Sequence, residues 1–245
     1  MNTSPSLATW LVYPGSIEKD RDEIYGYFDQ SITIPMCDGT NLHGWFFNRG
    51  ASAPLVCVYC GNGMNAGDMI FMATVDTSRS WLFMNYRGFG SSQGEPSEKL
   101  IVEDACFSIR YVRSLVRGAV GSLYLVGFSL GSAVATQVAV VERPEHLTLI
   151  CPMDCFHSVI GHRIPSPDFR YDTWRSIDYA PFVSCPVSIM YGKYDTIVPP
   201  TATLRLASAF PNPPHIRSYP SGHNDIFRQR HIMSHIYAVM ERSET

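Results

Sequence analysis

The sequence predicts a doubly wound α/β fold, in which helices cover both faces of a mostly parallel sheet. Five short runs are apolar on both faces, as the central strands of a parallel sheet are, and segments with helical periodicity separate them. The chain has 245 residues, of which 45% are hydrophobic and 17% charged, so it can bury one large core. We therefore expect a single domain, with residues 1–28 as an N-terminal extension that packs on it.

The strands follow in order along the chain. Residues 31–35 and 42–47 flank the turn-forming pair Asp38 and Gly39, a pattern typical of an antiparallel hairpin. The later strands are expected at residues 55–59, 81–84, 123–126, 147–150, 187–191 and 216–219. The sheet should therefore begin with an antiparallel hairpin and continue in parallel.

Two helices stand out between and after these strands. The first places five apolar residues on one side: Ile101, Ala105, Ile109, Val112 and Val116. The second, near the C-terminus, aligns Ile226, Met233, Ile236 and Met240. In alternating α/β folds, ligands bind at the carboxyl ends of the strands. We therefore expect the reacting groups in the loops that follow the strands.

Charge and cysteine content narrow the class of protein. A net charge of −3, without a Lys/Arg cluster, makes nucleic acid an improbable partner. Seven scattered cysteines do not form the dense, even-numbered framework of a secreted domain, so reduced thiols are expected. Cys151, Cys155 and His157 lack the second ligand pair of a zinc site, and buried small side chains are the favoured interpretation. We expect no metal and no cofactor.

The N-terminal segment has no signal-peptide pattern, and no apolar stretch approaches the roughly 20 residues that span a bilayer. We therefore expect a cytoplasmic protein. Apolar residues near the N-terminus either contact a membrane surface or pack on the domain, and packing is favoured. These residues are Leu7, Trp10, Leu11 and Tyr13. The sequence sets no oligomeric state.

The residues Gly-Phe-Ser-Leu-Gly at 127–131 lie between an apolar strand and a stretch compatible with a helix. In a tight strand–turn–helix junction, a serine at the apex projects its hydroxyl beyond the sheet edge. Flanking glycines give such a turn room because they have no Cβ. Ser129 is therefore the candidate nucleophile.

Two later strand-end loops supply an acid and a base. Asp195 follows the strand at 187–191, and His223 follows the strand at 216–219. A neutral His223 would take the proton from Ser129, while Asp195 would hold the imidazole in the correct tautomer. Asp154, after the strand at 147–150, is a rival acid, and Asp195 is favoured over it.

Acyl transfer also requires donors for the oxyanion of the tetrahedral intermediate. The loop at residues 60–63 directly follows the strand at 55–59, and Leu130 follows the nucleophile. We assign the oxyanion hole to the backbone N–H groups of Asn62 and Leu130. The substrate pocket is expected to include Cys60, Gly61, Phe128, Phe156 and Tyr194.

These motifs together resemble the α/β-hydrolase superfamily. The resemblance rests on the strand–turn–helix junction at residues 127–131, which we call the elbow. It rests also on residues 59–63, 85–98 and 191–195, and on the chain order serine, acid, histidine. Within this superfamily, the chain resembles more narrowly the compact, nearly capless intracellular serine hydrolases, which include Bem46-like proteins and depalmitoylating thioesterases. Cys60 stands where these relatives commonly have histidine, and Asn85 where many have aspartate. The resemblance implies a serine hydrolase that works through an acyl-enzyme.

The length of chain available to cover the site indicates the substrate class. Only about 30 residues, Phe156 to Pro186, are available for a cover between the strand at 147–150 and the acid loop, so an open site is expected. An open groove suits an ester or thioester hydrolase acting on acylated small molecules, lipids or proteins. Two alternatives stay open at this point. They are an aminopeptidase of the same fold and a catalytically silent, hydrolase-like binding protein.

Overall fold

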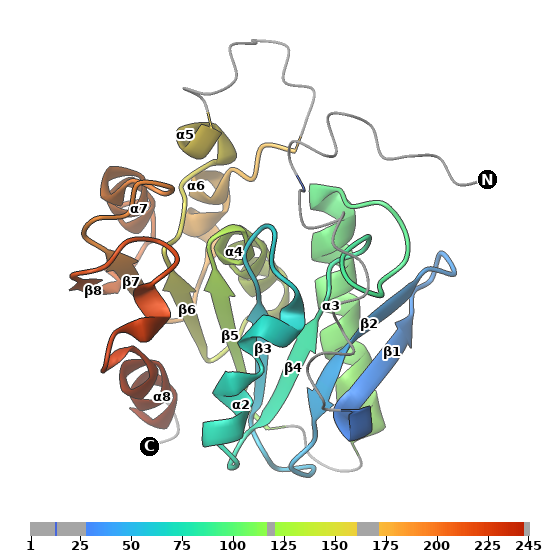
Figure 1. The fold of residues 1–245 in the computed structure, drawn as a ribbon. Helices are drawn as coiled ribbons and strands as arrows, with labels where there is room; N and C mark the ends of the chain where they lie inside the picture. The colour runs from blue at the N-terminus through green and yellow to red at the C-terminus, as the bar shows by residue number, and fades with distance from the viewer. Residues whose placement is uncertain (1–12, 14–27, 117–120, 161–171, 243–245) are drawn as a thin grey trace.

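The computed structural model describes residue 13 and residues 28–116, 121–160 and 172–242 (Figure 1). The described strands form one sheet in the order β1-β2-β4-β3-β5-β6-β7-β8. Their bounds are β1 Ser31–Pro35, β2 Asn41–Phe47, β3 Leu55–Tyr59, β4 Ser80–Met84, β5 Leu123–Phe128, β6 His146–Ile150, β7 Val187–Gly192 and β8 His215–Tyr219. β2 pairs antiparallel with β1 and β4, and all other pairs are parallel. The predicted sheet and its N-terminal hairpin are confirmed.

Helices cover both faces of this sheet. The α-helices are α2 Phe71–Val75, α3 Glu98–Leu115, α4 Leu130–Glu142, α5 Phe156–Ile160, α6 Ser176–Tyr179, α7 Pro200–Ala207 and α8 Ile232–Arg242. Short 3-10 turns are η3 Phe28–Gln30, η4 Ala66–Met69, η5 Ala180–Phe182 and η6 Ile226–Arg228. α3, α4, α6 and α7 pack side by side in one layer. α2 and α8 are joined by a hydrogen bond from the Tyr237 hydroxyl to the Met72 carbonyl. Figure 1 shows these layers around the sheet.

Burial explains why the central strands carry apolar side chains on both faces. Every residue of β3, β4, β5 and β6 is buried, because helices cover them from both sides. β8 closes one edge of the sheet and is different. Four of its five residues are at least partly exposed, among them Ile216 and Arg217. The sheet thus has a dry centre and a solvated β8 edge.

The helix predicted from residues 101–116 is α3, and the Ser97 side chain accepts the Leu100 N–H at its start. The C-terminal prediction was wrong in its extent. Ile226 lies in the separate turn η6, and α8 begins only at Ile232, because the backbone at Gln229 is extended (φ −70°, ψ 125°). Ile226 and Ile236 are nevertheless both fully buried.

The expected packing of residues 1–28 falls mostly outside the described residues. Tyr13 is described and is buried. Its ring makes edge contacts with Phe89 and Trp174, and its hydroxyl donates to Asp172 at 2.5 Å. Part of the segment where a cover was expected, residues 161–171, also lies outside the described residues. Within the described part, no helix combines the length and the apolar character needed to cross a bilayer.

Candidate active site

Ser129 occupies the turn between β5 and α4 in a strained backbone conformation. Its φ of 53° and ψ of −118° lie in a region that costs a non-glycine residue roughly 1–3 kcal/mol. Two hydrogen bonds hold it there: the Ser129 N–H donates to the Ile150 carbonyl at 2.9 Å, and the Ser132 hydroxyl donates to the Ser129 carbonyl at 2.5 Å. The turn therefore presents the Ser129 hydroxyl at the carboxyl edge of the sheet, as the sequence predicts.

The two glycines flanking Ser129 are required by close packing of α4 on the sheet. A Cβ at Gly131 would lie 2.0 Å from the Tyr59 carbonyl oxygen, and a Cβ at Gly127 would lie 2.3 Å from the Gly131 carbonyl oxygen. Both contacts are with backbone atoms, which cannot move aside as a flexible side chain does. The elbow thus requires a residue without a Cβ at each position.

The loop after β7 positions Asp195. Gly192 permits a close approach to the loop after β8, since a Cβ there would lie 2.4 Å from the Ser221 carbonyl oxygen. The Asp195 Oδ1 atom accepts hydrogen bonds from the Ile197 and Val198 N–H groups at 2.9 and 2.8 Å. Its other oxygen, Oδ2, is left to face the imidazole. The carboxylate is therefore fixed in direction by backbone donors.

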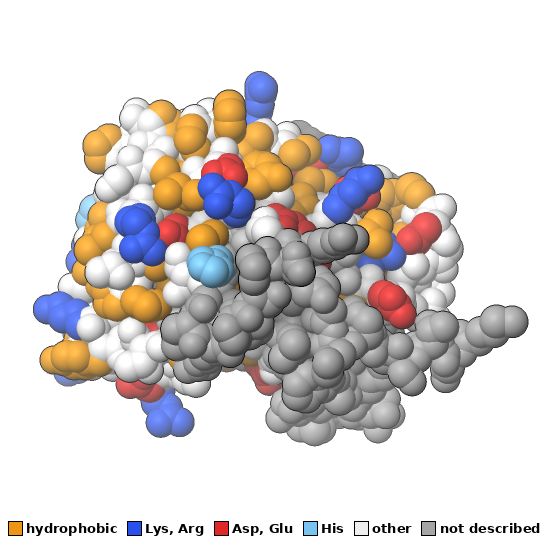
Figure 2. All heavy atoms as spheres, turned by 90° about the horizontal axis from the view of Figure 1, so that it is seen from above, with side chains coloured by type: hydrophobic (Ala, Val, Ile, Leu, Met, Phe, Trp, Pro, Cys, Tyr) orange, Lys and Arg blue, Asp and Glu red, His pale blue; other side chains and the backbone are white. Residues whose placement is uncertain are grey.

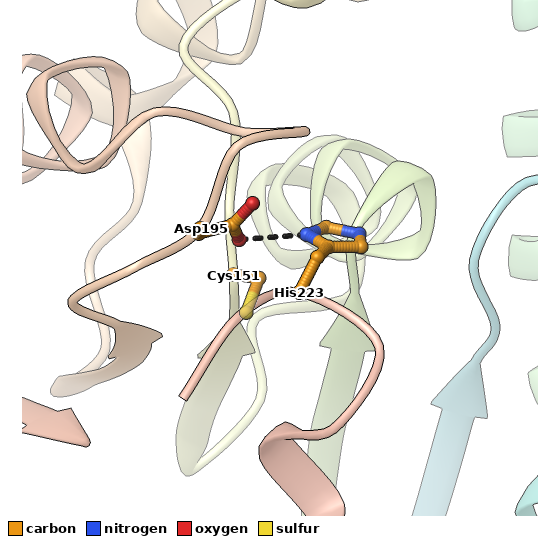
Figure 3. A group of neighbouring side chains, drawn as sticks. All are labelled: Cys151, Asp195 and His223. Carbon is orange, nitrogen blue, oxygen red and sulfur yellow. Dashed lines mark hydrogen bonds and ion pairs between the residues drawn. The ribbon is translucent and has the colours of Figure 1, made fainter. Parts of the chain in front are cut away.

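His223 lies between the acid and the serine. Its Nδ1 is 2.7 Å from Asp195 Oδ2, and its Nε2 is 2.9 Å from Ser129 Oγ. A neutral imidazole protonated on Nδ1 satisfies both bonds, as donor to the carboxylate and acceptor from the hydroxyl. All three side chains come from strand-end loops, and His223 and Asp195 are drawn in Figure 3. The structure brings the three predicted residues together.

Asp154, the rival acid, has other partners. Its Oδ2 accepts from Arg205 Nε at 2.8 Å, and its Oδ1 accepts from the Cys155 N–H at 2.8 Å. The Asp154 backbone carbonyl in turn accepts the Ile177 N–H. Asp154 thus ties α7 to the start of α5 and α6, and the carboxylate that faces His223 is that of Asp195.

The loop that carries Asn62 is held by two side chains from the segment after β4. The Tyr86 hydroxyl donates to the Cys60 carbonyl at 2.8 Å, and Asn85 Oδ1 accepts the Ala66 N–H at 2.8 Å. Asn85 therefore supplies an acceptor, as an aspartate would, without a charge. Leu130 is the first residue of α4, where N–H groups have no carbonyl partner within the helix and attract anions.

The predicted pocket residues have different surroundings. Gly61 lies against Phe128, because a Cβ at Gly61 would be 3.2 Å from the Phe128 ring. Phe128 also stacks at a tilt on His223, with ring centroids 5.1 Å apart. Tyr194 is exposed and Phe156 is buried at the start of α5. The Cys60 side chain is buried, and its thiol donates to the Met64 carbonyl at 3.8 Å. Cys60 therefore does not line a surface pocket.

Cys151 lies beside Asp195 and His223, a position that sequence analysis did not single out (Figure 3). It directly follows β6, and this strand lies between β5 and β7 in the sheet. One ligand atom from each of the three residues lies within 4.8 Å of the others. The donors do not suit a metal, since both ring nitrogens of His223 are hydrogen-bonded and burial raises the pKa of the Cys151 thiol well above its usual value.

The burial of the thiols predicts their reactivity. Cys37 is exposed and Cys155 is half-buried, while the other five are buried: Cys57, Cys60, Cys106, Cys151 and Cys185. Burial raises the pKa of Cys60 to about 12, so it holds almost no thiolate near neutral pH. In the native protein we expect Ellman's reagent to react rapidly with Cys37 alone, and Cys37→Ser to abolish the fast phase. A fast phase that Cys60→Ser removes would contradict this.

Sequence comparison decides the family. The profile of the family described as serine hydrolase (FSH1) matches residues 59–224, which include the elbow, Asp195 and His223. The chain belongs to the FSH1 serine hydrolase family. This FSH1-family chain is 32% identical over 207 residues to the uncharacterized protein Rv2307c of Mycobacterium tuberculosis, covering 80% of this chain and 73% of that one.

This FSH1-family chain is also similar to a lipase in sequence and to an esterase in structure. It is 26% identical over 177 residues to the lysophosphatidylserine lipase ABHD12 of Danio rerio, covering 61% of this chain and 45% of the lipase. The Pyrococcus furiosus esterase Pf2001 superposes with a TM-score of 0.71 at 15% sequence identity, covering 86% of this chain and 91% of the esterase. The compact α/β-hydrolase fold is confirmed.

Proposed function

We propose that the chain hydrolyses carboxylic ester or thioester bonds of acylated substrates through an acyl-enzyme on Ser129. One observation carries the proposal: the His223 imidazole is hydrogen-bonded at once to Ser129 Oγ and to Asp195 Oδ2. This is the arrangement that activates a serine hydroxyl for attack on a carbonyl. Membership of a serine hydrolase family, and likeness to an esterase and to a lysophosphatidylserine lipase, support it further.

In the proposed acylation step, Ser129 Oγ bonds to the carbonyl carbon while its proton moves to His223 Nε2. The carbonyl oxygen becomes an oxyanion, which the N–H groups of Leu130 and Asn62 and the N-terminus of α4 stabilise. The intermediate then collapses, the bond to the alcohol or thiol breaks, and the leaving group takes the proton from His223. Asp195 stabilises the imidazolium that exists between these transfers.

Deacylation repeats these steps with water. Water gives a proton to His223 Nε2 as its oxygen attacks the acyl carbon, and Ser129 takes the proton back as the ester bond to the enzyme breaks. The products are a carboxylic acid and the free enzyme. The acyl group therefore passes first to Ser129 and then to water, and every proton passes through one imidazole nitrogen.

A fluorophosphonate probe and p-nitrophenyl acyl esters of graded length test the proposal. We expect covalent labelling at Ser129 and turnover of at least one ester. Absence of both from folded protein would leave the binding-protein alternative. Turnover of aminoacyl-naphthylamides in place of the esters would favour the peptidase alternative.

We also propose that the chain works in the cytoplasm. All seven of its cysteines are free thiols, as is usual where glutathione keeps proteins reduced. Fluorescence microscopy of the tagged full-length chain tests this, and accumulation in an oxidising compartment would reject it.

Removing the hydroxyl of Tyr86 should impair the oxyanion loop. Tyr86→Phe leaves the buried Cys60 carbonyl without its donor, which costs about 1–3 kcal/mol of stability. Since the loop then holds Asn62 less firmly, we expect kcat to fall about tenfold while KM changes little. Steady-state kinetics on one ester and thermal unfolding measure the two effects. An unchanged kcat in a destabilised variant would limit Tyr86 to a structural role.

A further inference from the structure

Three aromatic rings form a continuous row that begins at His223. The Phe128 ring lies 5.1 Å from the His223 ring, Phe227 packs edge-on against Phe128 at 5.1 Å, and Phe71 packs edge-on against Phe227 at 5.7 Å. Exposure increases along the row. Phe128 is 4% exposed, Phe227 is half-buried and Phe71 is 38% exposed. The row thus leads from the reacting centre to the protein surface.

The row is assembled from three separate parts of the fold. Phe128 ends β5, Phe227 lies in η6 after the His223 loop, and Phe71 begins α2. The oxyanion loop adjoins it, since a Cβ at Gly61 would be 3.2 Å from both the Phe128 ring and the Met64 sulfur. An acyl group whose carbonyl oxygen lies at this loop therefore has apolar rings beside it.

The opposite side of the site is different. There the loop after β7 presents Tyr194, which is 68% exposed, next to the exposed Lys193. The contact of Tyr194 with the neighbouring loop is a backbone hydrogen bond from its N–H to the Ser221 carbonyl. No continuous packing of rings leads away from His223 on this side among the described residues. Figure 2 looks onto this edge of the sheet and shows hydrophobic side chains among charges of both signs.

We propose that the ring row binds the acyl chain of the substrate, so that the preferred substrate carries a linear, apolar acyl group of medium or greater length. Phe128 and Phe227 contact the part of the chain near the carbonyl, and Phe71 contacts its distal part. This inference rests on the proposed ester or thioester hydrolysis. Burial of one methylene is worth about fourfold in binding, so affinity should rise with chain length until the row is filled.

The experiment measures kcat/KM for p-nitrophenyl acetate, butyrate, octanoate and dodecanoate. For wild type we expect an increase from acetate to octanoate. Phe71→Ala should lower kcat/KM for dodecanoate about tenfold and leave acetate within twofold. Phe227→Leu, which keeps an apolar side chain beside Phe128, should lower kcat/KM for the octanoate and dodecanoate esters. Val75→Ala is the matched control, because Val75 is also on α2 and is 71% exposed, and all four esters should be unaffected.

Several results would overturn the inference. They are an equal loss for all four esters in Phe71→Ala, no length preference in wild type, and a length profile altered by Tyr194→Ala but not by Phe71→Ala. Isothermal titration calorimetry measures the binding of free dodecanoate to Ser129→Ala, which does not depend on ester hydrolysis. It therefore tests the ring row separately from the proposed function. Weaker binding in Ser129→Ala/Phe71→Ala supports the ring row even without ester turnover, and equal binding overturns it.

Discussion

Ser129→Ala is expected to lower kcat on p-nitrophenyl esters by at least about 10⁴-fold and to abolish labelling by a fluorophosphonate. Without the hydroxyl no acyl-enzyme forms, and only the oxyanion donors and substrate binding remain to accelerate attack by water. The alanine keeps the Cβ, so the strained turn and the backbone bond to Ile150 should persist. Steady-state kinetics and mass spectrometry of the labelled protein are the measurements.

The control is Ser114→Ala. Ser114 lies on α3, is exposed, and its hydroxyl donates to the Tyr111 carbonyl of the same helix, so activity and labelling should stay at the wild-type level. Thermal unfolding of both variants shows whether each is folded. Turnover by folded Ser129→Ala within tenfold of wild type would contradict the role proposed for this residue.

The second large effect concerns stability. Arg87 makes a bidentate ion pair with Asp104, with Nε–Oδ2 and Nη2–Oδ1 distances of 2.7 Å, and the two side chains are only 5% and 8% exposed. Arg87→Ala leaves the Asp104 carboxylate buried without its partner. We expect the free energy of unfolding to fall by about 3–5 kcal/mol, measured by urea denaturation. Lys99→Ala removes an exposed pair with Glu103 on α3 and should cost less than about 1 kcal/mol.

The double variant Arg87→Met/Asp104→Leu separates the buried charge from packing. Burial raises the pKa of the Asp104 carboxyl although Arg87 pulls it down, so desolvation outweighs the attraction. Removing both charges should therefore restore most of the stability lost in Arg87→Ala. A double variant as unstable as Arg87→Ala would instead assign the loss to the shape of the two side chains.

Much of this architecture could be predicted from sequence because its signals are local. The strands at 55–59 and 187–191 are apolar on both faces, and only a central strand buries such a pattern. The elbow at 127–131 is likewise a short motif whose glycines have a steric reason, which the Cβ positions at Gly127 and Gly131 bear out. Since parallel strands end at one edge, the meeting of Ser129, Asp195 and His223 could be expected.

Contacts between distant elements could not be predicted in this way. The bond from Tyr86 to the Cys60 carbonyl and the packing of Phe227 on Phe128 depend on how loops fold over the sheet edge. The helix break before Ile232 was not predicted, because Ile226 is buried like the apolar residues of α8. Its apolar character therefore continues the helical pattern across the break. Cys151 could have been noted as the residue directly after the strand beside β5.

The exposed edge strand β8 has a consequence for the lifetime of the reacting array. Among the described strands β8 pairs only with β7, and His223 follows it, whereas Ser129 lies directly after β5, which is paired on both sides. Fraying begins where backbone hydrogen bonds are solvated and partners are few. A brief detachment of β8 from β7 would move the His223 imidazole away from Ser129 while the interior of the sheet stays native. The enzyme would then lose its base through a local opening, at a smaller free-energy cost than global unfolding.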